Sequence, residues 1–435
     1  MRTYLILFLC VSCCVFHASA QVKETSNRIL VEMQEGKTTT IIPLLSEQMR
    51  ASVTEAQLSS IWGALQKQMG DFIEVTGESE QKVAVGVSYS QILRFKNATL
   101  NFILNYDEAG QIIGFFFRPT QQMAKVAFKQ ADYDLSENYT ERKIMVTTGD
   151  YKLPGLLTLP KGLTNVPVVI LVHGSGPNDM DETIGPNRVF ADLAAGLAQQ
   201  GIATIRYEKR TKTYGAQLAK DTTMTLDQEV TEDAISAVKL AAAQVEIDPQ
   251  QIFVLGHSLG GMTAPRIGQY AGVKGIIIAA GNARPLEDVL IDQYDLLTDG
   301  LAEREDIMTN IKTEVNNVKK LKPTIYIPTD QLPLGMPQAY WLFLNEYDQV
   351  ATAKKLKKPI LVLQGEDDYQ VTMKDFDLWK KALPKATFKS YPEMNHLLMK
   401  SDGKIGNEAY KTAGNVEKVL IDDVANWIKS LKASK

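Results

Sequence analysis

The spacing of apolar residues divides the chain, after its first twenty residues, into two parts. In residues 21–120, helical spacing comes first and strand spacing follows. Apolar residues recur every three or four positions over Thr54–Met69, which predicts an amphipathic helix with Thr54 as its N-cap. Three strands are expected after it, at Gln81–Gln91, Ala98–Tyr106 and Gln111–Arg118. This order predicts a small α+β accessory domain in which helices cover an antiparallel sheet.

Residues 142–435 alternate between strand and helix. Val166–Val172 is wholly apolar, as expected for a central strand of a parallel sheet. Further apolar runs lie at Ile202–Tyr207, Gln251–Leu255, Gly275–Ala280 and Pro359–Gln364. Helical segments separate these runs, which predicts an α/β fold with a doubly wound, mostly parallel sheet covered on both faces. We interpret the polar residues 121–141 as a linker.

Residues 282–351 interrupt this alternation. Helices are expected at Leu286–Leu297, Leu301–Leu321 and Tyr340–Val350, with prolines between the second and the third. An insertion that follows the carboxyl end of a strand lies above any site at that edge of the sheet. The insertion is therefore a predicted lid.

The first twenty residues resemble an export signal. Arg2 supplies a positive start, Tyr4–Phe16 is almost wholly apolar, and Ala18–Ala20 fits a small-residue cleavage site. The apolar stretch is shorter than the roughly 20 residues of a spanning helix, so we expect no membrane span. Residues 1–20 are thus a predicted signal peptide, and the protein is expected in the periplasm or secreted.

All three cysteines, Cys10, Cys13 and Cys14, lie within this segment. A mature chain that begins near Gln21 would contain no cysteine and could form no disulfide. Lipid attachment at Cys13 or Cys14 is the alternative, but the residues before each cysteine match a lipoprotein signal poorly.

The composition excludes several classes of function. Among the 435 residues, 45% are hydrophobic and 23% are charged, as in ordinary globular proteins. The net charge of −4 provides no basic surface, so nucleic acid is not an expected partner. The sequence has no phosphate-binding loop or dinucleotide fingerprint, and its histidines lie in separate motifs. We therefore expect no metal and no cofactor.

A candidate nucleophile lies in the segment Gly256-His257-Ser258-Leu259-Gly260. This segment follows the apolar run Ile252–Leu255 and fits the pattern G-x-S-x-G. Glycines at these two positions allow a tight turn from strand to helix, which places Ser258 at the edge of the sheet. A glycine-rich turn with no catalytic role is the alternative interpretation.

A serine hydroxyl becomes a good nucleophile only when a base accepts its proton. Of the four histidines, His17 belongs to the signal, His173 opens a glycine-rich loop, and His257 should point away from its neighbour Ser258. His396, on a loop after the last predicted strand, is the predicted base. A carboxylate must orient it, and the spacing alone leaves three candidates: Glu366, Asp367 and Asp368.

Backbone donors are also needed, because negative charge develops on the carbonyl oxygen of an acyl substrate. The N–H groups of Leu259 and Ser175 are the predicted donors, and Gly174 and Gly176 allow the backbone to approach a ligand closely. A simple tight turn would also account for these glycines.

These motifs, in the order Ser258, acid, His396, resemble those of exported bacterial α/β-hydrolases of the carboxylesterase or serine-aminopeptidase-like type. The resemblance covers nearly the whole mature chain, and residues 25–120 are similar to a small domain of unknown function, DUF3887. The segments that carry it are His173–Asn187, Ile205–Arg210, Gly256–Gly260, Tyr340–Trp341, Ile360–Val371 and Asn395–His396. The resemblance implies that the third residue after Gly365, Asp368, is the acid. It also leads us to assign His173, Tyr340 and Trp341 to the substrate pocket.

The favoured hypothesis is a serine hydrolase that cleaves a small-molecule carboxylic ester through an acyl-enzyme on Ser258. A peptidase or amidase with the same triad is the first alternative, in which Asp292, Asp295, Glu303 or Glu305 of the lid could anchor a charged terminus. A non-catalytic binding protein that kept the fold is the second. The natural substrate and the oligomeric state stay open.

Overall fold

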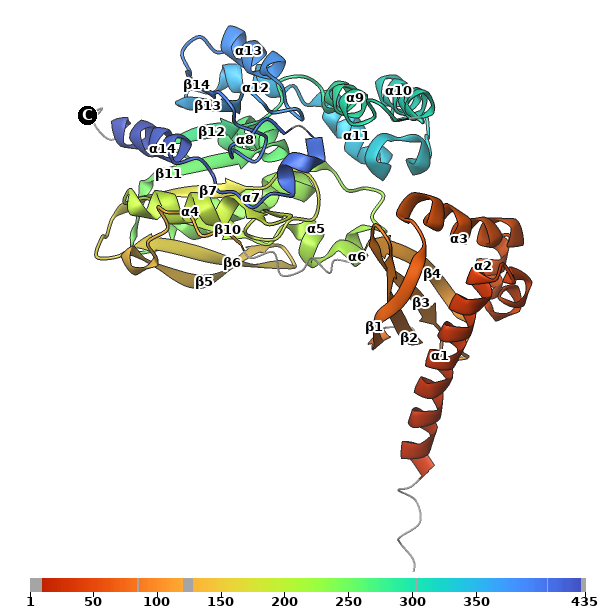
Figure 1. Cartoon of the computed structure of the whole chain (residues 1–435). Helices are drawn as coiled ribbons and strands as arrows, with labels where there is room; N and C mark the ends of the chain where they lie inside the picture. The colour runs from red at the N-terminus through yellow and green to blue at the C-terminus, as the bar shows by residue number, and fades with distance from the viewer. Residues whose placement is uncertain (1–9, 84–85, 120–127, 302, 405, 432–435) are drawn as a thin grey trace, which may run out of the picture. The chain divides into compact units, whose positions relative to one another are not determined.

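The computed structural model describes residues 10–83, 86–119, 128–301, 303–404 and 406–431 (Figure 1). The chain forms two compact units, Met1–Lys125 and Val126–Lys435. Residues 1–9 of the predicted signal lie outside the described part. Among the described residues, no helix is both long enough and apolar enough to cross a membrane.

The N-terminal unit is a four-stranded antiparallel sheet with helices packed on one face. The strands follow chain order: β1 (Phe72–Val83), β2 (Gly86–Phe95), β3 (Thr99–Tyr106) and β4 (Ile112–Pro119). Alternate residues of β3, from Leu100 to Tyr106, are buried, and they share a core with Ile29 and Trp62. The helices are α1 (Cys10–Gln34), α2 (Glu47–Ser52) and α3 (Glu55–Met69), with short 3₁₀ turns η1 (Thr38–Thr40) and η2 (Ile42–Leu44). This is the expected α+β architecture.

The start of α3 is as predicted, whereas the first strand is not. Thr54 caps α3 in a reciprocal capping box: its hydroxyl accepts from Gln57 N, and Gln57 Oε1 accepts from Thr54 N. The predicted strand Gln81–Gln91 was wrong, because two strands, β1 and β2, share that range. Most of β1 is exposed and polar, so it lacks the apolar alternation that marks a half-buried strand.

The C-terminal unit is built on an eight-stranded sheet in the order β14-β13-β12-β11-β7-β10-β6-β5. Neighbouring strands pair in parallel from β14 as far as β10, with β7 included. The hairpin of β6 and β5 then pairs antiparallel with β10 through β6. Their bounds are β5 (Tyr139–Thr148), β6 (Tyr151–Pro160), β7 (Val166–Val172), β10 (Ala203–Tyr207), β11 (Ile247–His257), β12 (Gly275–Ala279), β13 (Ile360–Gly365) and β14 (Thr387–Tyr391). A two-stranded ribbon, β8 (Thr183–Ile184) and β9 (Asn187–Arg188), lies in the loop after β7.

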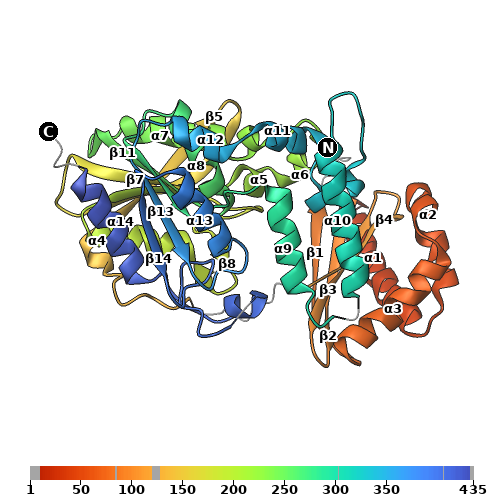
Figure 2. The same cartoon turned by 90° about the horizontal axis from the view of Figure 1, so that it is seen from above.

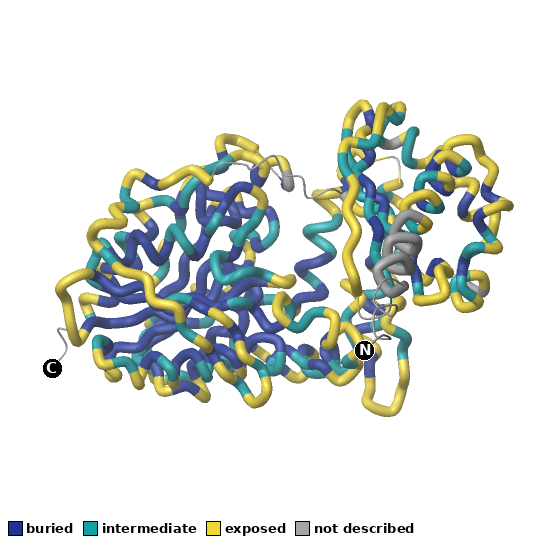
Figure 3. The backbone as a smooth tube through the Cα atoms, turned by 90° about the horizontal axis from the view of Figure 1, so that it is seen from below, coloured by how far each residue is buried: buried dark blue, intermediate teal, exposed yellow. Residues whose placement is uncertain are grey.

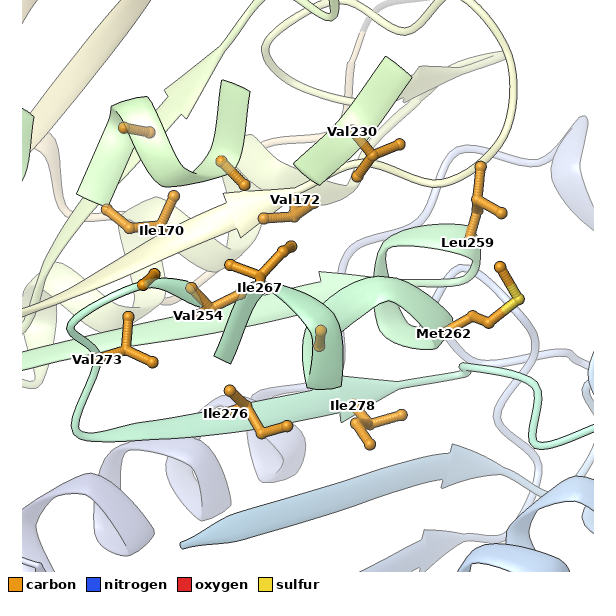
Figure 4. Packing of buried hydrophobic residues seen from close by; sticks show 14 of the residues in the cluster. Ile170, Val172, Val230, Val254, Leu259, Met262, Ile267, Val273, Ile276 and Ile278 are labelled. Carbon is orange, nitrogen blue, oxygen red and sulfur yellow. The ribbon is translucent and has the colours of Figure 1, made fainter. Parts of the chain in front are cut away.

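Helices cover both faces of this sheet (Figure 2). One face carries α4 (Val189–Gln199) and α14 (Lys418–Ser430); the other carries α7 (Glu232–Ala242), α8 (Leu259–Tyr270) and α13 (Met373–Ala382). Figure 3 shows the strands as the buried centre of the unit. In Figure 4, Ile267 of α8 packs against Val254 and Ile276 of neighbouring strands. Such two-sided burial explains the near-continuous apolar strands of the sequence.

The predicted linker is shorter than residues 121–141. Residues 120–127 lie outside the described part, and β5 begins at Tyr139. The residues between belong to the C-terminal unit: Ala131 is buried, and the Tyr133 hydroxyl donates to Val416 O at 2.6 Å. The polar composition predicted irregular backbone correctly but gave no sign of this packing.

The insertion after β12 is helical, as expected. It contains α9 (Leu286–Leu297), α10 (Arg304–Lys320), α11 (Gln338–Glu346) and α12 (Gln349–Lys355). The predicted helix Tyr340–Val350 was wrong as a single element, because Asp348 starts a new helix by accepting from Ala351 N at 2.7 Å.

The base of this insertion is bound to the body of the unit. Asp375 of α13 is fully buried and accepts from the backbone N–H groups of Ala283 and Arg284, at 2.9 and 3.0 Å, and from the Arg284 guanidinium at 2.8 Å. Farther along α9, the Gln293 amide donates to Gln370 O at 3.0 Å. Helix α9 is therefore attached at two points.

Candidate active site

Ser258 lies on a strained turn between β11 and α8. Its φ of 55° and ψ of −118° are rare for a residue with a side chain. A Cβ at Gly256 would lie 2.0 Å from Gly260 O, and one at Gly260 would lie 2.2 Å from Val172 O. Both glycines are thus sterically required. The Ser258 N–H donates to Ala279 O at 2.9 Å, which ties the turn to β12.

Ser258 and His396 line one cavity of about 170 Å³. The sheet side of the cavity includes Gly174, Ser175 and Leu259, and the lid side is apolar apart from Asn282 and Gln293. The lid residues that line it are Asn282, Leu286, Val289, Leu290, Gln293 and Leu334. The insertion therefore forms one wall of the cavity, as a lid would.

His396 is bound to Asp368. His396 Nδ1 lies 2.7 Å from Asp368 Oδ2, and both residues are buried. Asp368 Oδ1 accepts from the N–H groups of Gln370 and Val371, at 2.8 and 2.9 Å. The other two candidate carboxylates are exposed; Glu366 binds the Ser390 hydroxyl and Asp367 that of Ser401. Of the three, Asp368 is the carboxylate that meets the imidazole.

His257 turns away from Ser258 and contacts a carboxylate that the sequence did not reveal. Its Nε2 lies 2.7 Å from His396 O, and its Nδ1 lies 3.0 Å from Glu182 Oε2, a pair that is close but not well aligned for a hydrogen bond. Burial lowers the pKa of His257, but Glu182 and the His396 carbonyl outweigh it and the net pKa is raised. No local motif marks Glu182, because its partner is distant in sequence.

Ser175 and Leu259, whose backbone N–H groups are the predicted oxyanion donors, both line the cavity. Leu259 is the first residue of α8, so its N–H has no partner within the helix. Ser175 is exposed in the loop after β7. The N–H of Gly174 is already bound, because it donates to Glu182 Oε1 at 2.6 Å.

The predicted pocket residues His173, Tyr340 and Trp341 do not line this cavity, and that assignment was wrong. All three are buried in the protein interior. His173 Nε2 lies 3.0 Å from Asp179 O, and the Tyr340 hydroxyl donates to Glu229 Oε2 at 2.7 Å. A buried tyrosine can fill a core when its hydroxyl has a partner, and Tyr340 does so.

A second cavity of about 710 Å³ lies beside the first. Leu286 lines both, and Met262, Ala283, Leu344 and Tyr347 are among the other residues of the second. One leucine side chain therefore forms part of the wall between them.

Comparison with known proteins supplies the family. Residues 166–402 match the family described as serine aminopeptidase, S33. The chain belongs to this family. Residues 26–115 match a protein family of unknown function, DUF3887. The resemblance to α/β-hydrolases of the carboxylesterase or serine-aminopeptidase-like type, with a DUF3887 domain, is confirmed, and the sheet order and helical layers fit the α/β-hydrolase fold that it implied.

A relative covers most of the chain. Esterase EstD from Thermotoga maritima is 38% identical over 389 residues, which is 88% of this chain and 90% of that protein. Among solved structures, Est1E from Butyrivibrio proteoclasticus is 17% identical with a TM-score of 0.45, over 67% of this chain and 99% of its own. Proline iminopeptidase from Mycobacterium smegmatis is 16% identical with a TM-score of 0.45, over 67% and 98%.

Proposed function

We propose that this protein hydrolyses carboxylic esters through an acyl-enzyme on Ser258. The observation that carries the proposal is the strained turn of Ser258, which opens into the same cavity as the His396–Asp368 pair. The relative EstD, which matches this chain over 90% of its own length, is named an esterase. This supports an ester as the substrate.

In the first half-reaction, Ser258 Oγ attacks the carbonyl carbon while His396 Nε2 accepts its proton. Asp368 holds the Nδ1–H and stabilises the imidazolium that forms. The ester C–O bond then breaks, and the alcohol leaves with the proton from His396. Ser258 Oγ and His396 are not hydrogen-bonded among the described contacts; such bonds often tighten only around a bound substrate.

In the second half-reaction, water attacks the acyl carbon and gives a proton to His396, which returns it to Ser258 Oγ as the acid departs. The N–H groups of Ser175 and Leu259 would stabilise the oxyanion in both steps. The cavity of about 170 Å³ favours a small acyl group.

Aminopeptidase activity, which the family description suggests, is the second candidate. It requires a free carboxylate near the cavity to bind an α-amino group. Glu182 lines the cavity but is taken up by Gly174 N and His257. In the lid, Asp292 is paired with Arg284 and Asp295 with Arg304. This arrangement favours the ester.

The test is a panel of nitrophenyl esters of increasing acyl length beside aminoacyl nitroanilides. Wild type should hydrolyse the short esters fastest, and S258A should lose turnover and labelling by a fluorophosphonate. S136A, at an exposed serine of the C-terminal unit, is the matched control and should keep both. Activity or labelling retained by S258A, or faster cleavage of the anilides, would refute the ester proposal.

We also propose that residues 1–20 direct export to the periplasm or the medium. The sequence pattern supports this proposal. N-terminal sequencing of the protein from its native host should give Gln21 as the first residue. A lipid-modified N-terminus at Cys13 or Cys14, or an uncleaved cytoplasmic chain, would contradict it.

A further inference from the structure

The peptide group that joins Gly174 to Ser175 is held by side chains, among them the buried Lys209. Lys209 Nζ donates to Gly174 O at 2.7 Å, and the Asn178 amide donates to the same oxygen at 3.2 Å. The preceding N–H, that of Gly174, donates to Glu182 Oε1 at 2.6 Å. The orientation of this peptide is therefore set by two side chains of its own loop, Asn178 and Glu182, and by Lys209 from the segment after β10.

A fixed carbonyl also fixes the next N–H. In a planar trans peptide, the C=O of one residue and the N–H of the following residue point in opposite directions, and no cis peptide occurs among the described residues. Lys209 binds Gly174 O from the interior, whereas Ser175 lines the cavity. The hydrogen bond from Lys209 consequently holds the Ser175 N–H on the cavity side.

Lys209 is itself held by a buried network. Only 2% of Lys209 and 5% of Glu229 is exposed, and Nζ lies 2.6 Å from Glu229 Oε1. The other oxygen of Glu229 accepts from the Tyr340 hydroxyl at 2.7 Å. Burial and the neighbouring Glu229 raise the pKa of Tyr340 well above its usual value, so it stays a donor. The network runs from α11 of the lid, through Glu229 of the π-helical turn η4 (Asp227–Thr231), to the loop after β7.

We infer that Lys209 is a positioning residue for the ester hydrolysis proposed above: it orients the Ser175 N–H toward the substrate's carbonyl oxygen and polarises the peptide that carries it. A donor that is fixed before the reaction stabilises the oxyanion without having to reorganise. Such donors act most strongly in a site that excludes water. Hydrogen bonds in series also strengthen one another in a low-dielectric interior. The inference rests on the proposed function, because it assigns Lys209 to the same reaction.

The test compares three variants of the full chain with wild type. K209M removes both the charge and the donor, and K209Q keeps an amide donor without the charge. K212M makes the same change at an exposed lysine of α5 (Arg210–Thr213), the helix for which Lys209 is the N-cap residue, and should behave as wild type. Loss of a direct oxyanion donor costs about 10²–10³ in kcat. We expect K209M to lower kcat by about tenfold or more with KM nearly unchanged, and K209Q to recover part of the loss.

A trifluoromethyl ketone separates positioning from general damage to the fold. The hemiketal that this ketone forms with Ser258 Oγ carries an oxyanion, so the inhibition constant of the ketone should rise in K209M by a factor similar to the loss of kcat. A protein that is merely less well folded would bind the ketone as tightly in its folded fraction. If the unpaired Glu229 prevents K209M from folding, K209M/E229Q and K209Q serve in its place, with folding checked by circular dichroism.

The outcomes distinguish the positioning role of Lys209 from the proposed ester hydrolysis. Wild-type kcat and ketone affinity in folded K209M, alongside an inactive S258A, would overturn the role of Lys209 and leave the esterase proposal intact. Ester hydrolysis retained by S258A would overturn both. Loss of kcat and of ketone affinity together in K209M, with K212M unchanged, supports the inference.

Discussion

The imidazole of His257 lies against the backbone of His396, with 2.7 Å between His257 Nε2 and the His396 carbonyl oxygen. On its other side, Nδ1 faces Glu182 at 3.0 Å. Both ring nitrogens thus face oxygen atoms, and against the effect of burial the pKa of His257 is raised and that of Glu182 is lowered, which favours an imidazolium–carboxylate pair that is neutral as a unit. The residue next to the nucleophile therefore supports the loop that carries the predicted base.

Removing the imidazole should cost stability through Glu182. In H257F, the Glu182 carboxylate stays buried without its partner, a change that typically costs about 3–5 kcal/mol. H257F/E182Q lacks the carboxylate charge, so this double variant should regain most of the lost free energy of unfolding. The kcat should be reduced in both, because neither has a donor for the His396 carbonyl. Urea unfolding and ester kinetics measure the two effects, and equal instability of the single and double variants would show that Glu182 is not the cause.

Replacing Asp368 should affect turnover far more than replacing its acidic neighbour. D368N removes the charge that orients the imidazole, and comparable changes in serine proteases lower kcat by about 10⁴. We expect a loss of about 10³ or more with a modest change in KM. E366Q, at an exposed carboxylate two residues away, is the control and should stay within about twofold of wild type. A comparable loss in E366Q would contradict the assignment of Asp368.

The buried His173 should make stability depend on pH. Burial lowers its pKa to about 4, the largest effect, while nearby Glu182 opposes the shift. Below its ordinary pKa of about 6.5, the unfolded chain binds a proton that the folded chain does not, so folding is weakened as the pH falls toward 4. This contribution is about 2 kcal/mol at pH 5 and absent at pH 7.5.

H173Q, which cannot titrate, isolates the effect. The free energy of unfolding of wild type relative to H173Q should fall by about 2 kcal/mol between pH 7.5 and pH 5. Burial raises the pKa of Asp192 to about 6, so the contribution of this carboxyl to the free energy of unfolding changes with pH in the opposite direction. That contribution is the same in both proteins and cancels in the difference. Urea unfolding at the two pH values tests this, and a difference that does not change with pH would show that His173 is accessible to protons when folded.

Leu286 should limit the length of the acyl chain. It separates the cavity of about 170 Å³ from the neighbouring one of about 710 Å³. L286A should therefore shift the best nitrophenyl ester toward longer acyl chains, with kcat/KM for the shortest ester reduced. L297A, at an exposed leucine on the same helix, should keep the wild-type preference. An unchanged chain-length profile in L286A would mean that the two cavities do not act together.

The sequence predicted those features that depend on local chemistry. The glycines around Ser258 are required by close backbone contacts. The buried strands β7 and β12 of the large sheet are apolar throughout. Both features are therefore visible as patterns in the sequence. The partner of His396 could not be chosen from spacing, because Glu366, Asp367 and Asp368 are consecutive. Only the fold shows that the first two point outward, although the family resemblance had already indicated Asp368.

The remaining features depend on contacts between distant residues. Glu182 and His257 are 75 positions apart, and Lys209 and Gly174, which follow the neighbouring strands β10 and β7, are 35 positions apart, so neither pairing has a sequence signature. Tyr340 and Trp341 were assigned to the pocket because they belong to the resembling segments, yet their side chains fill the interior. The strand β1 was missed because an exposed polar strand has the composition of a loop.

The attachment of α9 through Asp375 and Gln293 has a mechanical consequence. Ala283 and Arg284, just before its first turn, are bound to α13, and Gln293 is bound to the backbone at Gln370. An outward swing of this helix as a hinged flap would break these hydrogen bonds. We therefore expect Leu286, Val289 and Leu290 to line the cavity before a substrate arrives, so that a fixed apolar wall limits the size of the acyl group.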